Sequence, residues 1–188
     1  MSDIKTLGKM RPAAAMEPAG KGAKPHAGRP DAPAAADAER LIEAIELLFF
    51  GYRDFVSEPD EILAAYEFGR AHHRVVHFVG RNPGITVAEL LDILRITKQS
   101  LARVLRQLIE RGFVEQKTGE KDRRQRRLYL TSAGGELLDR LMAPQMDRVR
   151  NALAAGGPGG EVAWREVMLA LLDEEHRPEV EQIISKEP

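Results

Sequence analysis

The sequence of 188 residues contains no cysteine. This excludes disulfide-linked scaffolds, cysteine-ligated zinc, cysteine nucleophiles and thiol-based redox sensing. Long apolar runs are also missing, because none, residues 47–50 included, approaches the ~20 residues of a membrane-spanning helix. The N-terminus has no apolar stretch typical of a secretory signal, so we expect a cytoplasmic protein with no membrane segment.

Sequence motifs of common enzymes are absent as well. The chain has no hydrolase nucleophile elbow, no phosphate-binding glycine loop and no dinucleotide fingerprint. The glycine-rich stretch 156–160 carries a proline at its centre and is typical of a linker. We therefore expect neither an enzyme nor a cofactor-binding protein.

The net charge of −1 offers no overall attraction to nucleic acid, but the charges are unevenly distributed. Residues 95–127 contain eleven Lys and Arg against four Asp and Glu, a net +7, whereas residues 37–94 carry −6 and residues 161–188 carry −5. A basic segment between acidic ones is typical of a phosphate-binding surface. A solvated basic face that only balances its acidic neighbours is the alternative.

The first 79 residues of the chain divide into a tail and two predicted helices. Residues 1–36 are rich in Ala, Pro, Gly and Lys and have few large apolar residues, so we expect a disordered tail. Apolar residues then recur at helical spacing from Asp37 to about Ser57. Pro59 suits a helix start, which predicts a second helix from about Asp60 to Val79.

The middle of the chain predicts two short helices followed by a β-hairpin. Thr86 and Glu89 fit a capping box for a helix over 87–94, and Thr97 fits the cap of a helix over 98–111. The period then changes to that of strands at 113–117 and 126–130, with a polar loop at 118–125. Two helices joined by a tight turn and followed by a hairpin make a winged helix-turn-helix.

Two further helices are predicted at 131–154 and 161–173, with a kink or break at Pro144. The fold class is therefore mainly α, with about six helices and a two-stranded β-hairpin wing. The helices at 38–57, 132–154 and 161–173 are broadly apolar, and one winged unit cannot cover all of that surface. A second subunit would cover it, which predicts a homodimer.

The helix 98–111 is the predicted DNA-reading helix, because the second helix of a helix-turn-helix enters the major groove. Its apolar stripe must face the core, which leaves polar residues for the opposite face. The predicted DNA contacts of this helix are Thr97, Lys98, Gln99, Ser100, Arg103 and Arg106, with Gln107 near the edge. Gln pairs with adenine and Arg with guanine. An ordinary amphipathic surface helix is the alternative.

The loop of the hairpin is the second predicted DNA contact. Its basic residues and the acid among them are Lys121, Asp122, Arg123, Arg124 and Arg126. A narrow minor groove attracts inserted arginine, and a carboxylate can hold a guanidinium in one orientation. A solvated loop whose charges only raise solubility is the alternative.

Residues 86–135 resemble the MarR family of bacterial winged-helix regulators. The matching pattern is Leu105-x-x-Leu108-x-x-x-Gly112-Phe113-Val114, then Asp122-Arg123-Arg124, then Leu128-x-Leu130-Thr131-x-x-Gly134. The resemblance extends over about residues 38–173, and the combination of motifs is specific. Pro144, the glycine-rich break and the long N-terminal tail depart from the family pattern.

The resemblance implies a homodimer that binds a pseudo-palindromic site in double-stranded DNA, with an arginine of the Asp122–Arg124 motif in the minor groove. It also implies a small-molecule effector, often phenolic, bound between the dimer helices and the DNA-binding lobe. The corresponding division is a tail at 1–36, a winged-helix domain at 37–175 and a C-terminal tail at 176–188. Within the domain, 60–131 is the DNA-binding lobe, and 37–57 and 132–175 are dimerisation helices.

Two other functions stay open from the residues alone. One is a winged-helix module that binds protein and not DNA, with the two tails as docking segments. The other is a metal-responsive protein built on His72, His73 and His77, because His73 and His77 have a spacing that can ligate zinc. Packing near the dimer seam is the more favoured role of these histidines. The aromatic candidates for a ligand pocket or the core are Phe49, Phe50, Tyr52, Tyr66, Phe68 and Phe78.

Overall fold

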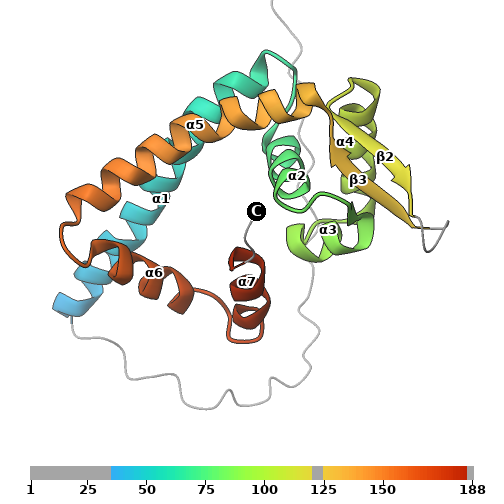
Figure 1. Ribbon diagram of the computed structural model, residues 1–188. Helices are drawn as coiled ribbons and strands as arrows, with labels where there is room; N and C mark the ends of the chain where they lie inside the picture. The colour runs from blue at the N-terminus through green and yellow to red at the C-terminus, as the bar shows by residue number, and fades with distance from the viewer. Residues whose placement is uncertain (1–34, 120–124, 186–188) are drawn as a thin grey trace, which may run out of the picture. The chain divides into compact units, whose positions relative to one another are not determined.

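The computed structural model describes residues 35–119 and 125–185, which form seven helices and three strands (Figure 1). The helices are α1 (Ala35–Ala64), α2 (Arg70–Arg81), α3 (Val87–Leu94), α4 (Lys98–Glu110), α5 (Ser132–Ala155), α6 (Gly160–Ala170) and α7 (Arg177–Ile184). The strands are β1 (Ile85–Thr86), β2 (Val114–Thr118) and β3 (Arg126–Leu130). Internal contacts separate residues 1–42 from residues 43–188, and the winged-helix fold lies in the second unit.

The mainly helical winged helix-turn-helix predicted from the sequence is confirmed. Within the described ranges it has one more helix and one more strand than expected. No helix in these ranges is both long enough and apolar enough to cross a membrane.

α1 runs without interruption through Pro59, so the predicted boundary between two helices at this proline is wrong. Proline lacks the N–H that would bond the carbonyl of Phe55 one turn earlier. The side-chain amide of Gln145, a buried residue of α5, lies 3.5 Å from this oxygen and donates to it. A donor from a distant part of the sequence thus replaces the missing backbone hydrogen bond.

A residue in the left-handed conformation closes the turn that follows the end of α1 at Ala64. Glu67 has a φ of 52°, and the N–H groups of Glu67 and Phe68 donate to the carbonyls of Ala64 and Leu63, each at 3.0 Å. This is the hydrogen-bonding pattern of a Schellman cap, which more often has glycine at the left-handed position. α2 begins after this cap, at Arg70, and not near Asp60 as predicted.

The two helices of the helix-turn-helix have the caps that the sequence predicts. Thr86 Oγ1 accepts from the N–H of Glu89 at 3.3 Å, and the Glu89 carboxylate accepts from the N–H of Thr86 at 2.8 Å. Thr97 Oγ1 accepts from the N–H of Ser100 at 3.2 Å at the start of α4. Between the helices Arg95 is left-handed, with a φ of 49°, so the chain turns within residues 95–97.

The wing belongs to a three-stranded antiparallel sheet with the order β1-β3-β2. β2 and β3 pair along their full lengths, close to the predicted hairpin. β1 pairs its two residues with Leu128 and Arg127 of β3. The sequence did not predict this strand, because two residues are too few to show the alternation of a strand.

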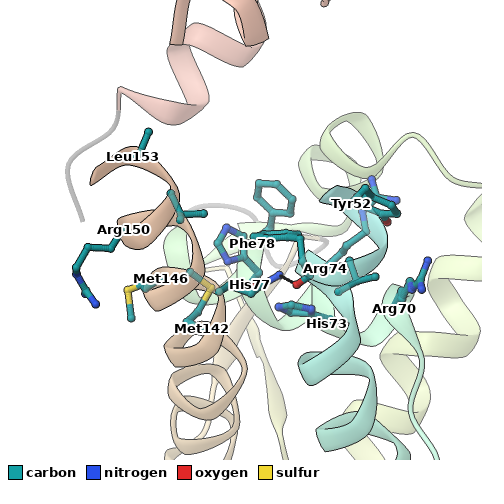
Figure 2. A pocket seen from close by; sticks show the side chains of 14 residues that line it. Tyr52, Arg70, His73, Arg74, His77, Phe78, Met142, Met146, Arg150 and Leu153 are labelled. Atoms are coloured by element: carbon teal, nitrogen blue, oxygen red, sulfur yellow. Dashed lines mark hydrogen bonds between the residues drawn. The ribbon is translucent and has the colours of Figure 1, made fainter. Parts of the chain in front are cut away.

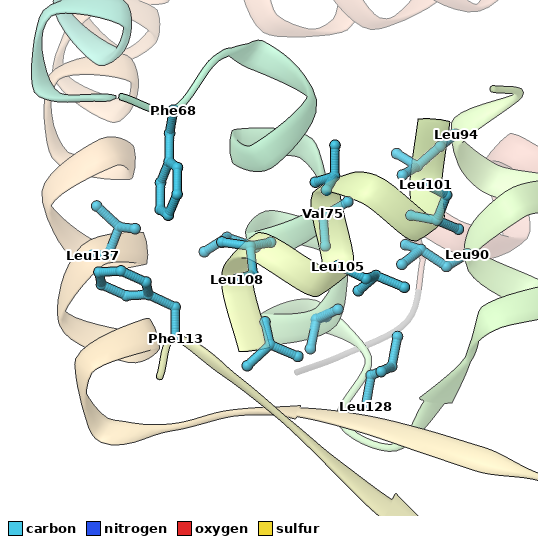
Figure 3. Packing of buried hydrophobic residues seen from close by; sticks show 14 of the residues in the cluster. Phe68, Val75, Leu90, Leu94, Leu101, Leu105, Leu108, Phe113, Leu128 and Leu137 are labelled. Carbon is cyan, nitrogen blue, oxygen red and sulfur yellow. The ribbon is translucent and has the colours of Figure 1, made fainter. Parts of the chain in front are cut away.

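The hydrophobic core joins the end of α1, α2, α3, α4, the sheet and the first half of α5 (Figure 3). Its fully buried leucines are Leu63, Leu90, Leu101, Leu108, Leu128, Leu137 and Leu141. On α4 the predicted apolar stripe is buried, except that Ile109 is only partly buried. Because this stripe is held in the core, the opposite face of α4 must be exposed to solvent.

The C-terminal helices differ from the sequence prediction in two places. α5 is continuous through Pro144, so the break considered there does not occur. α6 ends at Ala170, and α7 follows within residues that the sequence analysis assigned to a tail. Arg95 connects α7 to the helix-turn-helix, because its guanidinium lies 2.7 Å from His176 Nε2 and 3.1 Å from the Glu179 carboxylate.

Candidate nucleic-acid interface

The exposed face of α4 carries most of the residues predicted to contact DNA. Lys98, Gln99, Ser100, Arg103 and Arg106 are all exposed. Gln99, Arg103 and Arg106 lie on the side of α4 opposite its buried stripe, and Lys98 and Ser100 lie in the first turn. The structure therefore exposes all five side chains and brings Gln99, Arg103 and Arg106 together on one surface of a helix that is fixed by its other side.

The first turn of α4 is organised by two hydroxyl groups. Besides accepting from the N–H of Ser100, the Thr97 hydroxyl donates to Ser100 Oγ at 2.8 Å. These contacts give Thr97 and Ser100 a capping role in addition to the predicted contact with DNA. The start of a helix also carries the positive end of its dipole, which favours a phosphate at this position.

Gln107 differs from the sequence expectation, which placed it at the edge of the reading face. Its Oε1 lies 2.8 Å from His72 Nε2 on α2. His72 is only 7% exposed, and its Nδ1 accepts from the N–H of Gly69 at 3.1 Å. Because Nδ1 is an acceptor, Nε2 carries the proton and donates to Gln107. His72 therefore joins α2 to α4. His73 and His77, in contrast, line a pocket that does not include His72.

The described part of the wing is a paired, exposed ribbon. Arg126 is exposed and donates from Nη1 to Thr118 Oγ1 across the two strands at 2.9 Å. Below the tip, the N–H of Gly119 donates to the carbonyl of Gln125 at 2.9 Å. The other predicted wing contacts lie outside the described residues: Lys121, Asp122, Arg123 and Arg124.

A separate pocket of about 850 Å³ lies between α2 and α5 (Figure 2). The described residues that line it are Tyr52, Phe55, Val56, Arg70, His73, Arg74, His77, Phe78, Met142, Gln145, Met146, Val149, Arg150 and Leu153. Apolar and aromatic side chains form most of the wall, and the charged lining residues are all basic. Such a composition is typical of a site for a small organic molecule.

The two histidines of the pocket are partly withdrawn from solvent. Burial lowers the pKa of His73, and the neighbouring His77 lowers it further. Burial likewise lowers the pKa of His77, with a smaller effect from the charge of Arg81. Both rings are therefore held toward their neutral forms. Among the described residues, no group of three or more His, Asp or Glu side chains is arranged to hold a metal ion.

The aromatic residues considered for a ligand pocket fall into three groups. Tyr52 and Phe78 line the pocket. Tyr66 and Phe68 stack at 5.9 Å and pack in or against the core. Phe49 and Phe50 are 66% and 54% exposed on α1. Core packing thus explains some of these residues but not all of them.

Large apolar side chains are exposed on the outer helices. On α6 the exposed residues are Val162, Trp164 and Val167, and on the second-unit part of α1 they are Ile45, Leu47, Leu48, Phe49, Phe50 and Tyr52. Monomeric soluble proteins seldom expose extended apolar patches, and larger ones usually mark interaction surfaces.

Comparisons with known proteins also indicate a DNA-binding winged helix-turn-helix protein. The sequence model of the MarR family matches residues 66–125. A curated relative, the HTH-type transcriptional regulator PetP of Rhodobacter capsulatus, is 47% identical over 135 residues, which cover 72% of this chain and 81% of that protein.

Solved structures show the same fold at lower sequence identity. A MarR family transcriptional regulator from Silicibacter pomeroyi is 20% identical, with a TM-score of 0.59 over 76% of this chain and 98% of that chain. A mutant MarR from E. coli complexed with operator DNA is 18% identical, with a TM-score of 0.56 over 72% of this chain and 97% of that chain. The family match, the extended identity to PetP and the shared fold show that this chain belongs to the MarR family of winged helix-turn-helix transcriptional regulators.

Proposed function

We propose that this protein acts as a homodimer that binds a pseudo-palindromic DNA operator and regulates transcription from it. The observation that carries the proposal is the exposed face of α4, where Gln99, Arg103 and Arg106 lie opposite a buried leucine stripe. A helix of this kind fits the major groove, and its amide and guanidinium groups can distinguish base pairs. The relationship to PetP and the fold shared with an operator-bound MarR support the same conclusion.

The wing supplies the second contact in this proposal. Arg126 stands exposed on the strand that leads away from the tip. We assign minor-groove binding to the basic residues at the tip, Lys121, Arg123 and Arg124, with Asp122 orienting a guanidinium as the family resemblance implies.

The dimer follows from the apolar residues that one chain leaves exposed. Val162, Trp164 and Val167 on α6 have exposed fractions of 62%, 51% and 59%. A second copy of the chain would cover such residues and would relate the two α4 helices by a two-fold axis. The two half-sites would then lie ~34–36 Å apart, one turn of DNA.

The pocket between α2 and α5 is the proposed effector site. It is large enough for a small organic molecule, and its basic and aromatic walls suit an aromatic ligand that carries negative charge. It also lies on α2, which is bonded to α4 through His72 and Gln107. Occupancy of the pocket can therefore influence the reading helix.

Binding to a promoter fragment tests the assignment of the reading surface. We expect Arg124→Ala to weaken binding and Gln99→Ala to relax base preference, with each altered base contact worth ~1–3 kcal/mol. Arg148→Ala, which removes an exposed ion pair with Glu58 on the outer helices, is the matched control and should bind like wild type. Wild-type binding by both Arg124→Ala and Gln99→Ala would show that DNA is read elsewhere. Failure to bind any DNA would favour a protein-binding module.

A further inference from the structure

The C-terminal helix α7 lies beside α3 (Figure 1) and contacts the turn of the helix-turn-helix through Arg95. Arg95 follows α3 and is left-handed, with a φ of 49°. Its Nη1 lies 2.7 Å from His176 Nε2, and its Nη2 donates to the Glu179 carboxylate at 3.1 Å. Because arginine can only donate, the histidine nitrogen accepts in this contact. Both terminal nitrogens of one guanidinium are therefore engaged by α7 and its N-cap residue.

The segment that contains α7 is acidic, whereas Arg95 begins the basic segment of the chain. Residues 173–185 contain five Asp and Glu against one Arg, a net −4 with histidine neutral, and residues 95–127 carry +7. Glu175 adds a carboxylate 3.2 Å from the same His176 nitrogen that contacts Arg95. The acidic segment therefore places negative charge around the first cation of the basic segment.

The position of Arg95 suits a contact with the DNA backbone. Arg95 lies two residues before Thr97, the cap of α4, and the start of this helix favours a phosphate. A guanidinium binds a phosphate with two parallel hydrogen bonds, as it binds a carboxylate. A carboxylate of α7 and a phosphate of DNA are thus alternative partners for the same side chain.

The contacts that hold α7 are weak enough to be exchanged. α7 lies wholly within the described residues, and none of its eight residues is buried. A cavity of about 640 Å³ lies between α3 and the turn before β1 on one side and Glu179, Gln182 and Ile183 of α7 on the other. Arg95 and Glu179 are 52% and 42% exposed, and an ion pair this exposed contributes little to stability. Another partner can therefore replace α7 at a small cost in free energy.

We propose that α7 competes with DNA for Arg95: in the free protein α7 holds this guanidinium, and DNA binding transfers it from Glu179 to a backbone phosphate. This competition rests on the proposed DNA-binding function and adds to it one DNA contact and its intramolecular competitor. α7 thus lowers the affinity for DNA by the free energy of its contact with Arg95. Because a phosphate carries no sequence information, the effect is the same on every duplex and leaves base preference unchanged.

DNA binding by two single-charge variants of α7 tests the competition. Glu179 is bonded to Arg95, and Glu181 lies two residues later on another side of the helix. Glu179→Gln should bind the operator about two- to fivefold more tightly than wild type, as expected for release of one exposed ion pair. It should tighten binding to a duplex with scrambled half-sites by the same factor. Glu181→Gln, which removes the same charge, should bind nearly as wild type does.

Removal of the shared cation tests whether Arg95 carries the effect. Arg95→Gln should weaken operator binding about three- to tenfold, because one charged hydrogen-bonded contact is lost. The slope of log affinity against log salt concentration should become shallower by roughly 0.9, the value for one phosphate. In the Arg95→Gln background Glu179→Gln should have no further effect, since the two residues act as a pair. Circular dichroism melting of each variant checks that the fold is retained.

A label on the chain just after α7 tests whether this helix moves. Because the chain contains no cysteine, Ser185→Cys accepts a nitroxide spin label at a single position. We expect addition of the operator to increase the mobility of the label in its electron paramagnetic resonance spectrum. In the Glu179→Gln background the label should already be more mobile before DNA is added.

The outcomes separate the competition from the DNA-binding function. Unchanged or weaker binding by Glu179→Gln, or equal tightening by Glu181→Gln, would overturn the competition. So would tightening by Glu179→Gln that persists without Arg95, or a label whose mobility does not respond to the operator. Failure of wild type to bind any DNA would instead overturn the proposed function.

Discussion

The helix-turn-helix and wing differ from the outer helices in how their apolar residues are used. In the first region the large apolar residues are buried, and Leu90, Leu101, Leu108 and Leu128 are 0% exposed. On α6 and on the second-unit part of α1, by contrast, residues such as Trp164 and Phe49 are 51% and 66% exposed. The comparison shows that one chain completes the core of the reading unit, whereas the outer helices keep an exposed apolar surface, which is the surface that the proposed dimer would cover.

The largest expected effect comes from a cavity in the buried core of the helix-turn-helix. Leu108→Ala, on α4, should lower the free energy of unfolding by about 2–5 kcal/mol, because it removes a fully buried side chain from a closely packed core. Urea denaturation measures this change. The exposed Gln116→Ala on β2 serves as the control and should change stability by less than about 0.5 kcal/mol. A small effect of Leu108→Ala would mean that the reading unit has no tightly packed core.

A charge introduced on α6 tests whether the exposed apolar residues of this helix mediate self-association. Trp164→Asp should weaken self-association roughly 30-fold or more, as expected for loss of a central aromatic anchor. Sedimentation measures the association constant, and circular dichroism should show an intact helical fold. Arg165→Ala, its neighbour on another side of the helix, should associate nearly as wild type does. Unchanged association of Trp164→Asp would remove α6 from the proposed dimer interface.

Loss of the hydrogen bond between Gln145 of α5 and Phe55 of α1 should have an intermediate effect on stability. Gln145→Met should destabilise the fold by about 1–2 kcal/mol, because it leaves the Phe55 carbonyl without the donor that replaces the N–H missing at Pro59. In a Pro59→Ala background the helix regains its own N–H, so the same substitution should cost less. Equal costs in both backgrounds, measured by chemical denaturation, would show that Gln145 acts only through packing.

The smallest expected effect concerns the histidines of the pocket. Burial lowers the pKa values of His73 and His77 below their ordinary value of 6.5 in the folded state. The unfolded chain therefore binds protons more readily, so these residues make stability fall as pH decreases below about 6.5 and leave it unchanged well above that. His73→Gln and His77→Gln should each reduce the slope of unfolding free energy against pH between 5 and 7. His26→Gln, in the N-terminal segment, provides the control. An unchanged slope in both pocket variants would contradict the assignment.

Local signals in the sequence were sufficient to predict the helix-turn-helix. The capping residues Thr86, Glu89 and Thr97 lie beside the helices that they cap, and the structure shows each of these caps. The stripe from Leu101 to Leu108 likewise predicted which face of α4 is buried and therefore which face is exposed.

The errors arose where distant contacts override local preference. Pro59 predicts a helix boundary, but Gln145 supplies a donor from α5 and α1 continues. Glu67 carries no local sign of a left-handed cap, since glycine is the usual residue there. The hydrogen bond between His72 and Gln107 joins two helices through side chains that the sequence assigned to other roles.

The hydrogen bond from Arg74 to the end of α3 was also outside the reach of sequence reasoning. The side chain lies among basic residues and histidines of α2, and nothing in its local pattern indicates the carbonyl of Leu94. The missing cation in the last turn of α3 is the one signal that could have suggested a partner from elsewhere.

Genome-wide mapping of the DNA bound by wild type and by Arg103→Ala tests the central claim most directly. We expect wild type to enrich a pseudo-palindromic motif whose half-sites are about one helical turn apart, and the variant to lose that enrichment. Absence of any enriched motif for wild type, or the same motif at the same occupancy for Arg103→Ala, would contradict the conclusion that the exposed face of α4 reads DNA.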